Sequence, residues 1–220
     1  MAAPPGRIDS PESFQAAFGI SRETRDRLVT YADLLRRWQK TINLVAPSTL
    51  CDVWHRHFAD SAQLWKYRTS DAPNWLDLGS GAGFPGLVLA ILGAEKAATH
   101  HILVESDNRK AAFLREVARA TGITVDILCM RIENPETRVK ISSVDCITAR
   151  ALAPLPRLLE IAAPYFKSST LAMFLKGRDV AAEIEQAVQD WRFDYALEPS
   201  VTDEGARVVL LKALKPNREG

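Results

Sequence analysis

Cysteine is scarce in this chain, and its few cysteines form no recognisable pattern. Cys51, Cys129 and Cys146 are odd in number, and none belongs to a Cys-x-x-Cys pair. Their spacing argues against a disulfide framework and against a zinc site. Cys129 and Cys146 lie in apolar runs and are interpreted as core residues. The histidines have no metal-ligand neighbours in the sequence, so we expect no metal.

The chain also lacks a long hydrophobic run and an excess of charge of one sign. No apolar segment approaches the roughly 20 residues of a membrane-spanning helix, and no basic segment followed by an apolar one opens the sequence. These features predict a soluble, cytoplasmic protein without a membrane partner. The 28 basic and 27 acidic side chains leave a net charge of +1, so any nucleic-acid-binding surface must be local.

The first third of the chain has helical patterning. Residues 1–10 are rich in Pro, Gly and Ala and predict a loose arm. Apolar residues at three- and four-residue spacing predict a helix from Ser21 to about Asn43, and a second helix over 48–67. Residues 69–73 are typical of a junction. We therefore predict an arm and helical appendage over 1–71 and a second domain over 72–220.

Strand and helix signals alternate after the junction. Strands are predicted at 75–78, 102–105, 124–128, 144–149 and 170–175, with helices at 86–92, 109–121, 155–166 and 180–191. This alternation favours a parallel, doubly wound α/β sheet. The runs 195–201 and 208–213 predict an antiparallel hairpin at its edge. A mostly parallel seven-stranded sheet with such an ending is the layout of Rossmann-like class I methyltransferases.

The most informative motif covers residues 74–86, Asn-Trp-Leu-Asp-Leu-Gly-Ser-Gly-Ala-Gly-Phe-Pro-Gly. It reads as a buried strand, a glycine-rich turn and the start of a helix, which is the usual order in a nucleotide-type cofactor site. Gly79, Gly81 and Gly83 let backbone N–H groups approach a ligand closely. Asp77 adds a negative charge near the end of the strand.

The carboxylate decides which cofactor we expect. Asp77 would repel the phosphates of a dinucleotide, and Pro85 removes an N–H group that an anion would need. S-adenosylmethionine has no phosphate and carries two cationic groups, so we predict this methyl donor. A dinucleotide remains the alternative, because residues 81–86 match Gly-x-Gly-x-x-Gly literally.

Further candidate residues lie at the ends of later strands. Glu105 closes the second strand and is suited to accept hydrogen bonds from ribose hydroxyls, although it could be an ordinary surface glutamate. Ile132 and Glu133 follow the third strand, where an adenine ring could lie. Arg150 ends the fourth strand, and a guanidinium there matches guanine N7 and O6 or a phosphate. The alternative for Arg150 is a salt bridge to a helix.

Together these motifs resemble the bacterial methyltransferases of guanine N7 in small-subunit ribosomal RNA, the glucose-inhibited division protein B family. The resemblance extends from about Leu28 to the end of the chain. It runs through Asn43-Leu44, Arg56-His57, Asp60-Ser61, the turn 77–86, Glu105-Ser106, Arg109-Lys110, Phe113-Leu114, Arg131-Ile132-Glu133, Arg150-Ala151 and Leu175-Lys176-Gly177.

The resemblance implies specific roles. The cofactor would be S-adenosylmethionine, held by Asp77, Gly79, Gly81, Gly83, Phe84, Glu105, Ile132, Glu133 and Arg150. Arg150 would also position the base, without a general base. RNA would contact Asn43, Arg56, His57 and Lys176. The family substrate is a guanine in the decoding-region loop of 16S RNA, at position 527, and the partner would be naked RNA, an assembly particle or the small subunit.

Three other functions stay open from the sequence. A small-molecule methyltransferase would use the same cofactor site without RNA. An NAD-binding oxidoreductase would use the literal glycine match. A non-catalytic RNA-binding module would bind no cofactor. For His57, packing in the core is an equally good explanation of its position beside Val53 and Phe58.

Overall fold

The computed structural model describes residues 6–69, 73–95 and 99–217. The predicted domain boundary, between residues 71 and 72, lies outside the described residues, as does much of the predicted junction. The division into two domains therefore stays a prediction. In the described part of the chain, no helix is both long and apolar enough to span a bilayer.

The chain forms a seven-stranded, mostly parallel sheet, as predicted, and its strand order is β3-β2-β1-β4-β5-β7-β6. The first five strands pair in parallel. The last two form the predicted antiparallel hairpin, with β7 also antiparallel to β5. The strands are β1 (Asn74–Leu78), β2 (His100–Val104), β3 (Asp126–Leu128), β4 (Cys146–Arg150), β5 (Leu171–Lys176), β6 (Trp191–Pro199) and β7 (Arg207–Pro216).

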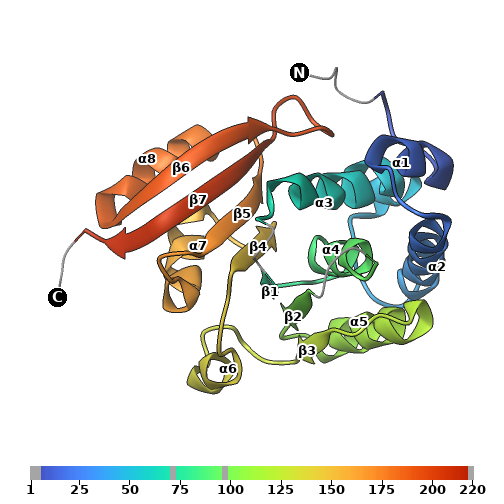
Figure 1. Ribbon diagram of the computed structural model, residues 1–220, viewed down its shortest axis with the longest axis horizontal. Helices are drawn as coiled ribbons and strands as arrows, with labels where there is room; N and C mark the ends of the chain where they lie inside the picture. The colour runs from blue at the N-terminus through green and yellow to red at the C-terminus, as the bar shows by residue number, and fades with distance from the viewer. Residues whose placement is uncertain (1–5, 70–72, 96–98, 218–220) are drawn as a thin grey trace.

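Helices cover both faces of the sheet (Figure 1). Buried residues of α4 (Gly86–Gly93) and α5 (Asn108–Thr121) share one core cluster with the N-terminal helices. A second cluster joins the other face to α7 (Leu155–Ala162), the following turn η4 (Ala163–Tyr165) and α8 (Val180–Asp190). The short helix α6 (Pro135–Lys140) was not predicted. Asn134 as the N-cap and Pro135 as the first helical residue are local signals of a helix start, but the strand patterns on either side drew attention away from them.

The N-terminal residues are more ordered than the sequence suggested. The prediction of a loose arm up to Ser10 is wrong for its described part, because Ile8 is buried and Ser10 caps helix α1 (Pro11–Phe18). Helix α1 was missed because it is short and packs through only one fully buried side chain, Phe14. Helix α2 (Arg22–Trp38) starts at the predicted cap Ser21 but ends five residues before Asn43.

The segment predicted as a second helix is helical but irregular. It passes through a 3-10 helix η1 (Pro47–Asp52), a π-helical turn η2 (Trp54–Ala59), α3 (Asp60–Ala62) and another 3-10 helix η3 (Gln63–Tyr67). A π-turn shifts side chains relative to a regular helix and is often found at functional sites. Here the π-turn contains Arg56 and His57, two of the predicted site residues.

The cysteines occupy three different environments. Cys146 is fully buried in β4, as predicted, whereas Cys51 is exposed. The interpretation of Cys129 as a core residue is wrong: it is half-buried just beyond β3, where its thiol lies 3.0 Å from Oδ1 of Asn108. Strand β3 ends at Leu128, so Cys129 lies beyond the sheet although the apolar run continues to Met130.

Candidate functional site

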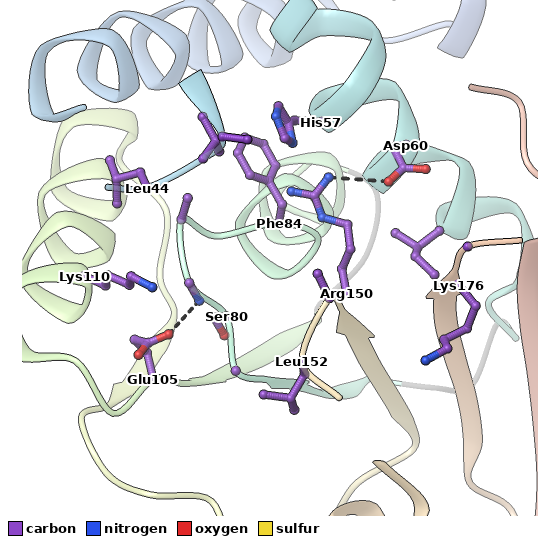
Figure 2. Close-up of a pocket in the computed structure, with 18 of the residues that line it drawn as sticks. Leu44, His57, Asp60, Ser80, Phe84, Glu105, Lys110, Arg150, Leu152 and Lys176 are labelled. Atoms are coloured by element: carbon purple, nitrogen blue, oxygen red, sulfur yellow. Dashed lines mark hydrogen bonds and ion pairs between the residues drawn. The ribbon is translucent and has the colours of Figure 1, made fainter. Parts of the chain in front are cut away.

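A cleft of about 760 Å³ opens where the parallel strands end (Figure 2). This volume is within the range of small-molecule and cofactor sites. The glycine turn after β1 and residues following β2, β3, β4 and β5 line one side. Residues within 44–60 and 200–207, from outside the parallel strands, line the other side. The cleft therefore combines the sheet edge with the N-terminal segment and the tip of the C-terminal hairpin.

The glycine turn has the backbone conformation that its sequence requires. Gly79, Gly81 and Gly83 have φ angles of +64°, +56° and +91°, which side chains with a β-carbon rarely adopt. A β-carbon at Gly79 would lie 2.5 Å from Cδ1 of Leu152, and one at Gly83 would lie 2.6 Å from the Tyr31 hydroxyl. These two positions are thus restricted by space as well as by φ.

Asp77 lies beneath the turn and does not line the cleft. Its side chain is buried, with Oδ1 accepting a hydrogen bond from the Thr148 hydroxyl at 2.7 Å. Oδ2 has no hydrogen-bond partner among the described residues. A β-carbon at Gly86, the first residue of α4, would lie 2.5 Å from this oxygen. Asp77 therefore presents its charge to the turn from below, through the closely packed start of α4.

Burial dominates the titration of Asp77. It raises the pKa of this carboxyl to about 6, while hydroxyls of Thr148 and Ser80, the backbone of Gly86 and the charge of Arg150 limit the rise. When no ligand is bound, the ionised form of Asp77 is thus destabilised relative to the protonated form. A cation bound above the turn would favour that form, so the orphaned Oδ2 fits a cationic ligand.

Glu105 fixes the loop geometry from the end of β2. Its Oε2 accepts a hydrogen bond from the backbone N–H of Gly81 at 2.8 Å, and its Oε1 accepts one from the N–H of Asp107 at 2.7 Å. Glu105 lines the cleft with only 8% of its surface exposed. Each carboxylate oxygen can accept more than one hydrogen bond, so Glu105 can hold the turn and still accept hydrogen bonds from a ligand.

Arg150 projects from the end of β4 into the cleft (Figure 2). Its Nη1 donates to the carbonyl of Arg56 at 3.1 Å and lies 3.4 Å from Oδ2 of Asp60. The guanidinium carbon lies 5.0 Å from the centre of the Phe84 ring, a cation–π distance. Arg150 thus lines the cleft and also forms the salt bridge that was its alternative interpretation. The next residue, Ala151, has a φ of 53°, a strained conformation often found at functional sites.

His57 packs in the wall of the cleft as a neutral ring. Its ring stacks on Phe84 at 5.0 Å, and its Nε2 lies 2.8 Å from the Thr49 hydroxyl. Because that hydroxyl donates to the carbonyl of Ala46, we assign the proton of His57 to Nε2. Burial, with the charges of Arg150 and Arg56, lowers the pKa of His57 to about 3. His57 is therefore both a core residue and a cleft residue.

Of the other predicted site residues, Ile132, Glu133 and Arg56 line the cleft and Asn43 does not. Ile132 and Glu133 line the cleft after β3, with Glu133 paired to Arg157 at 3.1 Å. Arg56 lines the cleft and pairs with Asp203 at 3.1 Å. Asn43 is exposed and contacts Gln39 at 3.4 Å, and it is not among the cleft residues.

Lys176 lines the cleft but is largely engaged in the fold. Its Nζ lies 2.5 Å from Oε2 of Glu183 and donates to the carbonyl of Ala153 at 3.0 Å. Glu183 also accepts a hydrogen bond from the N–H of Leu155, the first residue of α7. The lysine therefore ties the end of β5 to the loop after β4.

Among the residues at the site that were missed from the sequence are Tyr31 and Leu152. Tyr31, on α2, donates a hydrogen bond to the carbonyl of Ala82 within the turn and stacks on Phe84. Leu152 packs on Gly79. Tyr31 belongs to the apolar stripe of its helix and Leu152 lies in a loop, so neither carried a signal that separated it from ordinary core residues. Among the described residues, no group of three or more possible metal ligands occurs.

The strand order, the cleft at the strand ends and the glycine turn define a class I, S-adenosylmethionine-dependent methyltransferase. Two solved structures support the fold. A mutant of MtNAS in complex with S-adenosylmethionine gives a TM-score of 0.55 at 16% identity, covering 95% of this chain and 85% of that one. The METTL16 MTase domain gives 0.54 at 13% identity, covering 86% and 80%.

The chain belongs to the GidB family, described as rRNA small subunit methyltransferase G, whose model matches residues 24–209. The "Ribosomal RNA small subunit methyltransferase G" of Rhodospirillum centenum is 50% identical over 203 residues, which are 92% of this chain and 90% of that protein. The protein of the same name from Parvibaculum lavamentivorans is 47% identical over 210 residues, covering 96% and 92%. The oxidoreductase and non-catalytic alternatives are therefore wrong.

Proposed function

We propose that this protein transfers the methyl group of S-adenosylmethionine to N7 of a guanine in 16S ribosomal RNA, the guanine at position 527. Family membership supports the substrate class. The observation that carries the proposal to a guanine is the guanidinium of Arg150 in the cleft. It has donors for O6 of guanine, the acceptor beside N7, and leaves the lone pair of N7 free to take the methyl group.

The residues in the cleft and Asp77 beneath it would have different roles. The cofactor supplies an electrophilic methyl group on a positively charged sulfur. Gly79, Gly81 and Gly83 shape its pocket, Glu105 holds the turn and accepts hydrogen bonds, and the charge of Asp77 stabilises cationic groups from below. Ile132 and Glu133 would contact the adenine side of the pocket. These roles fit the closely packed turn and the orphaned Asp77 oxygen.

Arg150 would position the base, and no general base is needed. Guanine N7 carries a free lone pair, so forming its bond to carbon while the sulfur–carbon bond breaks releases no proton at the reacting atom. The rate would come from holding the base in line with the methyl group. The nearby titratable groups agree with this: His57 is neutral with a lowered pKa, and Asp60 is paired with Arg150.

On the other side of the cleft, Arg56 and His57 would meet the RNA together with Asn43 beyond its rim. A substrate rich in phosphates should dissociate from such a surface as salt rises. A small-molecule substrate would be far less sensitive. Salt dependence therefore separates the proposed function from a small-molecule methyltransferase. The physical form of the substrate, whether naked RNA, an assembly particle or the complete subunit, can be compared in the same assay.

The decisive test is nucleoside mass spectrometry of 16S RNA from cells with and without this protein. We expect one 7-methylguanosine to be missing without it, and to be restored when purified protein and labelled S-adenosylmethionine are added to the deficient RNA or subunits. Arg150→Ala should lower the transfer rate much more than it lowers stability. An unchanged nucleoside profile would overturn the RNA substrate and leave the small-molecule alternative.

A further inference from the structure

The tip of the β6–β7 hairpin is fastened to the N-terminal segment within one wall of the cleft. The Nε2 of His55 donates to the carbonyl of Thr202 at 3.1 Å. The side chain of Gln63 accepts from the N–H of Val201 at 3.0 Å and donates to the Ser200 hydroxyl at 3.3 Å. These contacts and the Arg56–Asp203 ion pair join two segments that are far apart in the sequence, and the two segments together form the far wall of the cleft.

Asp60 stands where this wall meets the guanidinium of Arg150. Its Oδ1 accepts hydrogen bonds from the Thr202 hydroxyl at 3.0 Å and from Nε2 of Gln63 at 2.9 Å. Its Oδ2 faces Nη1 of Arg150 at 3.4 Å (Figure 2). The side chains of Asp60 and Arg150 are only 15% and 18% exposed, so each charge depends on the other for compensation.

The contact with Asp60 restricts the orientation of the Arg150 guanidinium. The Nη1 nitrogen is used by Asp60 and by the carbonyl of Arg56. Within the described residues, Nε and Nη2 of Arg150 have no hydrogen-bond partner. The planar guanidinium has a fixed fork of donors. It is held at Nη1 by Asp60 and the carbonyl of Arg56, and its carbon lies over the Phe84 ring. These contacts also fix the direction of its remaining donors.

We propose that Asp60 is a positioning residue for Arg150, and that through Thr202 it makes the orientation of the guanidinium depend on the docked hairpin tip. The inference rests on the proposed function, in which Arg150 orients the acceptor base. Asp60 itself touches neither reactant. It acts by holding Nη1 so that the remaining donors of Arg150 stay aimed at O6 of the base, beside the reacting N7.

The two oxygens of Asp60 allow a selective variant. Asp60→Asn can keep its oxygen toward Thr202 and Gln63, which places its NH₂ group toward Nη1 of Arg150. Two donors would then face each other, and the guanidinium would be released while the hairpin tip stays bound. Thr202→Val removes only the hydroxyl that joins Asp60 to the tip. The control is Asp33→Asn, which breaks an exposed ion pair with Arg36 on α2.

The test is methylation of deficient small subunits or RNA, with kcat and KM measured for each substrate. For Asp60→Asn we expect kcat to fall at least about tenfold, because a misplaced orienting group can cost about a hundredfold. The affinity for S-adenosylmethionine, measured by calorimetry, should stay within about twofold, since no contact with the glycine turn is lost. Thr202→Val should show a smaller loss in kcat, and Asp33→Asn none.

A double-variant cycle separates positioning from general damage to the fold. If Asp60 acts through Arg150, adding Asp60→Asn to Arg150→Ala should cause no further loss, because coupled residues are not additive. A normal kcat for Asp60→Asn, or losses that multiply in the double variant, would overturn the inference. Should Asp60→Asn fail to fold, Thr202→Val carries the same kcat test. If the wild-type protein methylates no RNA, the proposed function fails instead.

Discussion

The hydroxyl of Tyr31, on helix α2, donates a hydrogen bond to the carbonyl oxygen of Ala82 in the middle of the glycine turn. The ring of Tyr31 also stacks on Phe84 at 5.3 Å and meets Phe58 edge-on at 5.1 Å. A helix outside the sheet thus holds the cofactor turn from behind. The N-terminal region is therefore a structural part of the cofactor site as well as one wall of the cleft.

Tyr31→Phe should weaken the binding of S-adenosylmethionine several-fold. The substitution keeps the ring but leaves the buried Ala82 carbonyl without its partner, which costs about 1–3 kcal/mol of stability. Calorimetric titration and urea unfolding measure the two effects. Tyr195→Phe, at a tyrosine that is 49% exposed, is the matched control and should change neither. Unchanged cofactor affinity in Tyr31→Phe would mean that the turn keeps its shape without this hydrogen bond.

Gly79→Ala should abolish cofactor binding, whereas Gly122→Ala should not affect it. Both glycines have a φ of +64°, so each substitution carries about the same backbone penalty, roughly 1–2 kcal/mol. Only at Gly79 does the new β-carbon meet another side chain, Leu152. Gly122 caps the end of α5 outside the turn, so comparing the two variants by calorimetry separates an effect at the turn from a general effect of the backbone penalty. Equal affinities in both would show that the packing of Leu152 on Gly79 is unimportant.

The affinity for S-adenosylmethionine should rise with pH through about 6. The raised pKa of Asp77 means that its folded form holds a proton more tightly than the unfolded chain does. The stability that Asp77 contributes is therefore lost as pH rises from about 4 to 6, leaving a buried charge that costs roughly 3 kcal/mol. A cationic ligand offsets this cost. Titrations at pH 5 and pH 7.5 should differ for the wild type and much less for Asp77→Asn.

Lys176→Met should lower stability more than it lowers affinity for RNA. The side chain of Lys176 is only 9% exposed, and removing it leaves Glu183 without its ion-pair partner, which we expect to cost about 2–4 kcal/mol. Chemical unfolding measures this loss, and Glu183→Gln in the same background should restore part of it. The exposed Lys140→Met is the control. A variant of normal stability with weaker, less salt-dependent RNA binding would instead assign Lys176 to the RNA surface.

The sequence predicted the sheet and the glycine turn well because their signals are local. Each parallel strand is a short apolar run, and the turn contains glycines at the positions where φ is positive. Arg150 and Glu105 were placed correctly at strand ends by the same reasoning. The helix α1 and the irregular course of 47–67 were harder, because tertiary packing around Trp54 and Phe58 decides them more than helix propensity does.

What could not be predicted depends on contacts between distant parts of the chain. Tyr31 and Ala82 are 51 residues apart, and Asp60 and Thr202 are 142 apart. No local pattern marks such pairs. For Asp77, the sequence indicated a carboxylate near the turn, but the side of the strand on which it lies follows from its pairing with Thr148 on β4. Its position below the turn therefore required the three-dimensional fold.

The hairpin tip that completes the far wall of the cleft also determines when, during synthesis, the site can form. Synthesis proceeds from the N-terminus, so residues 55–63 leave the ribosome long before residues 200–207, to which they are bonded in the finished fold. Until those last residues emerge, the far wall of the cleft is incomplete and Asp60 lacks Thr202. A nascent chain should therefore be inactive on the ribosome that is making it, and activity should appear only with the completed polypeptide.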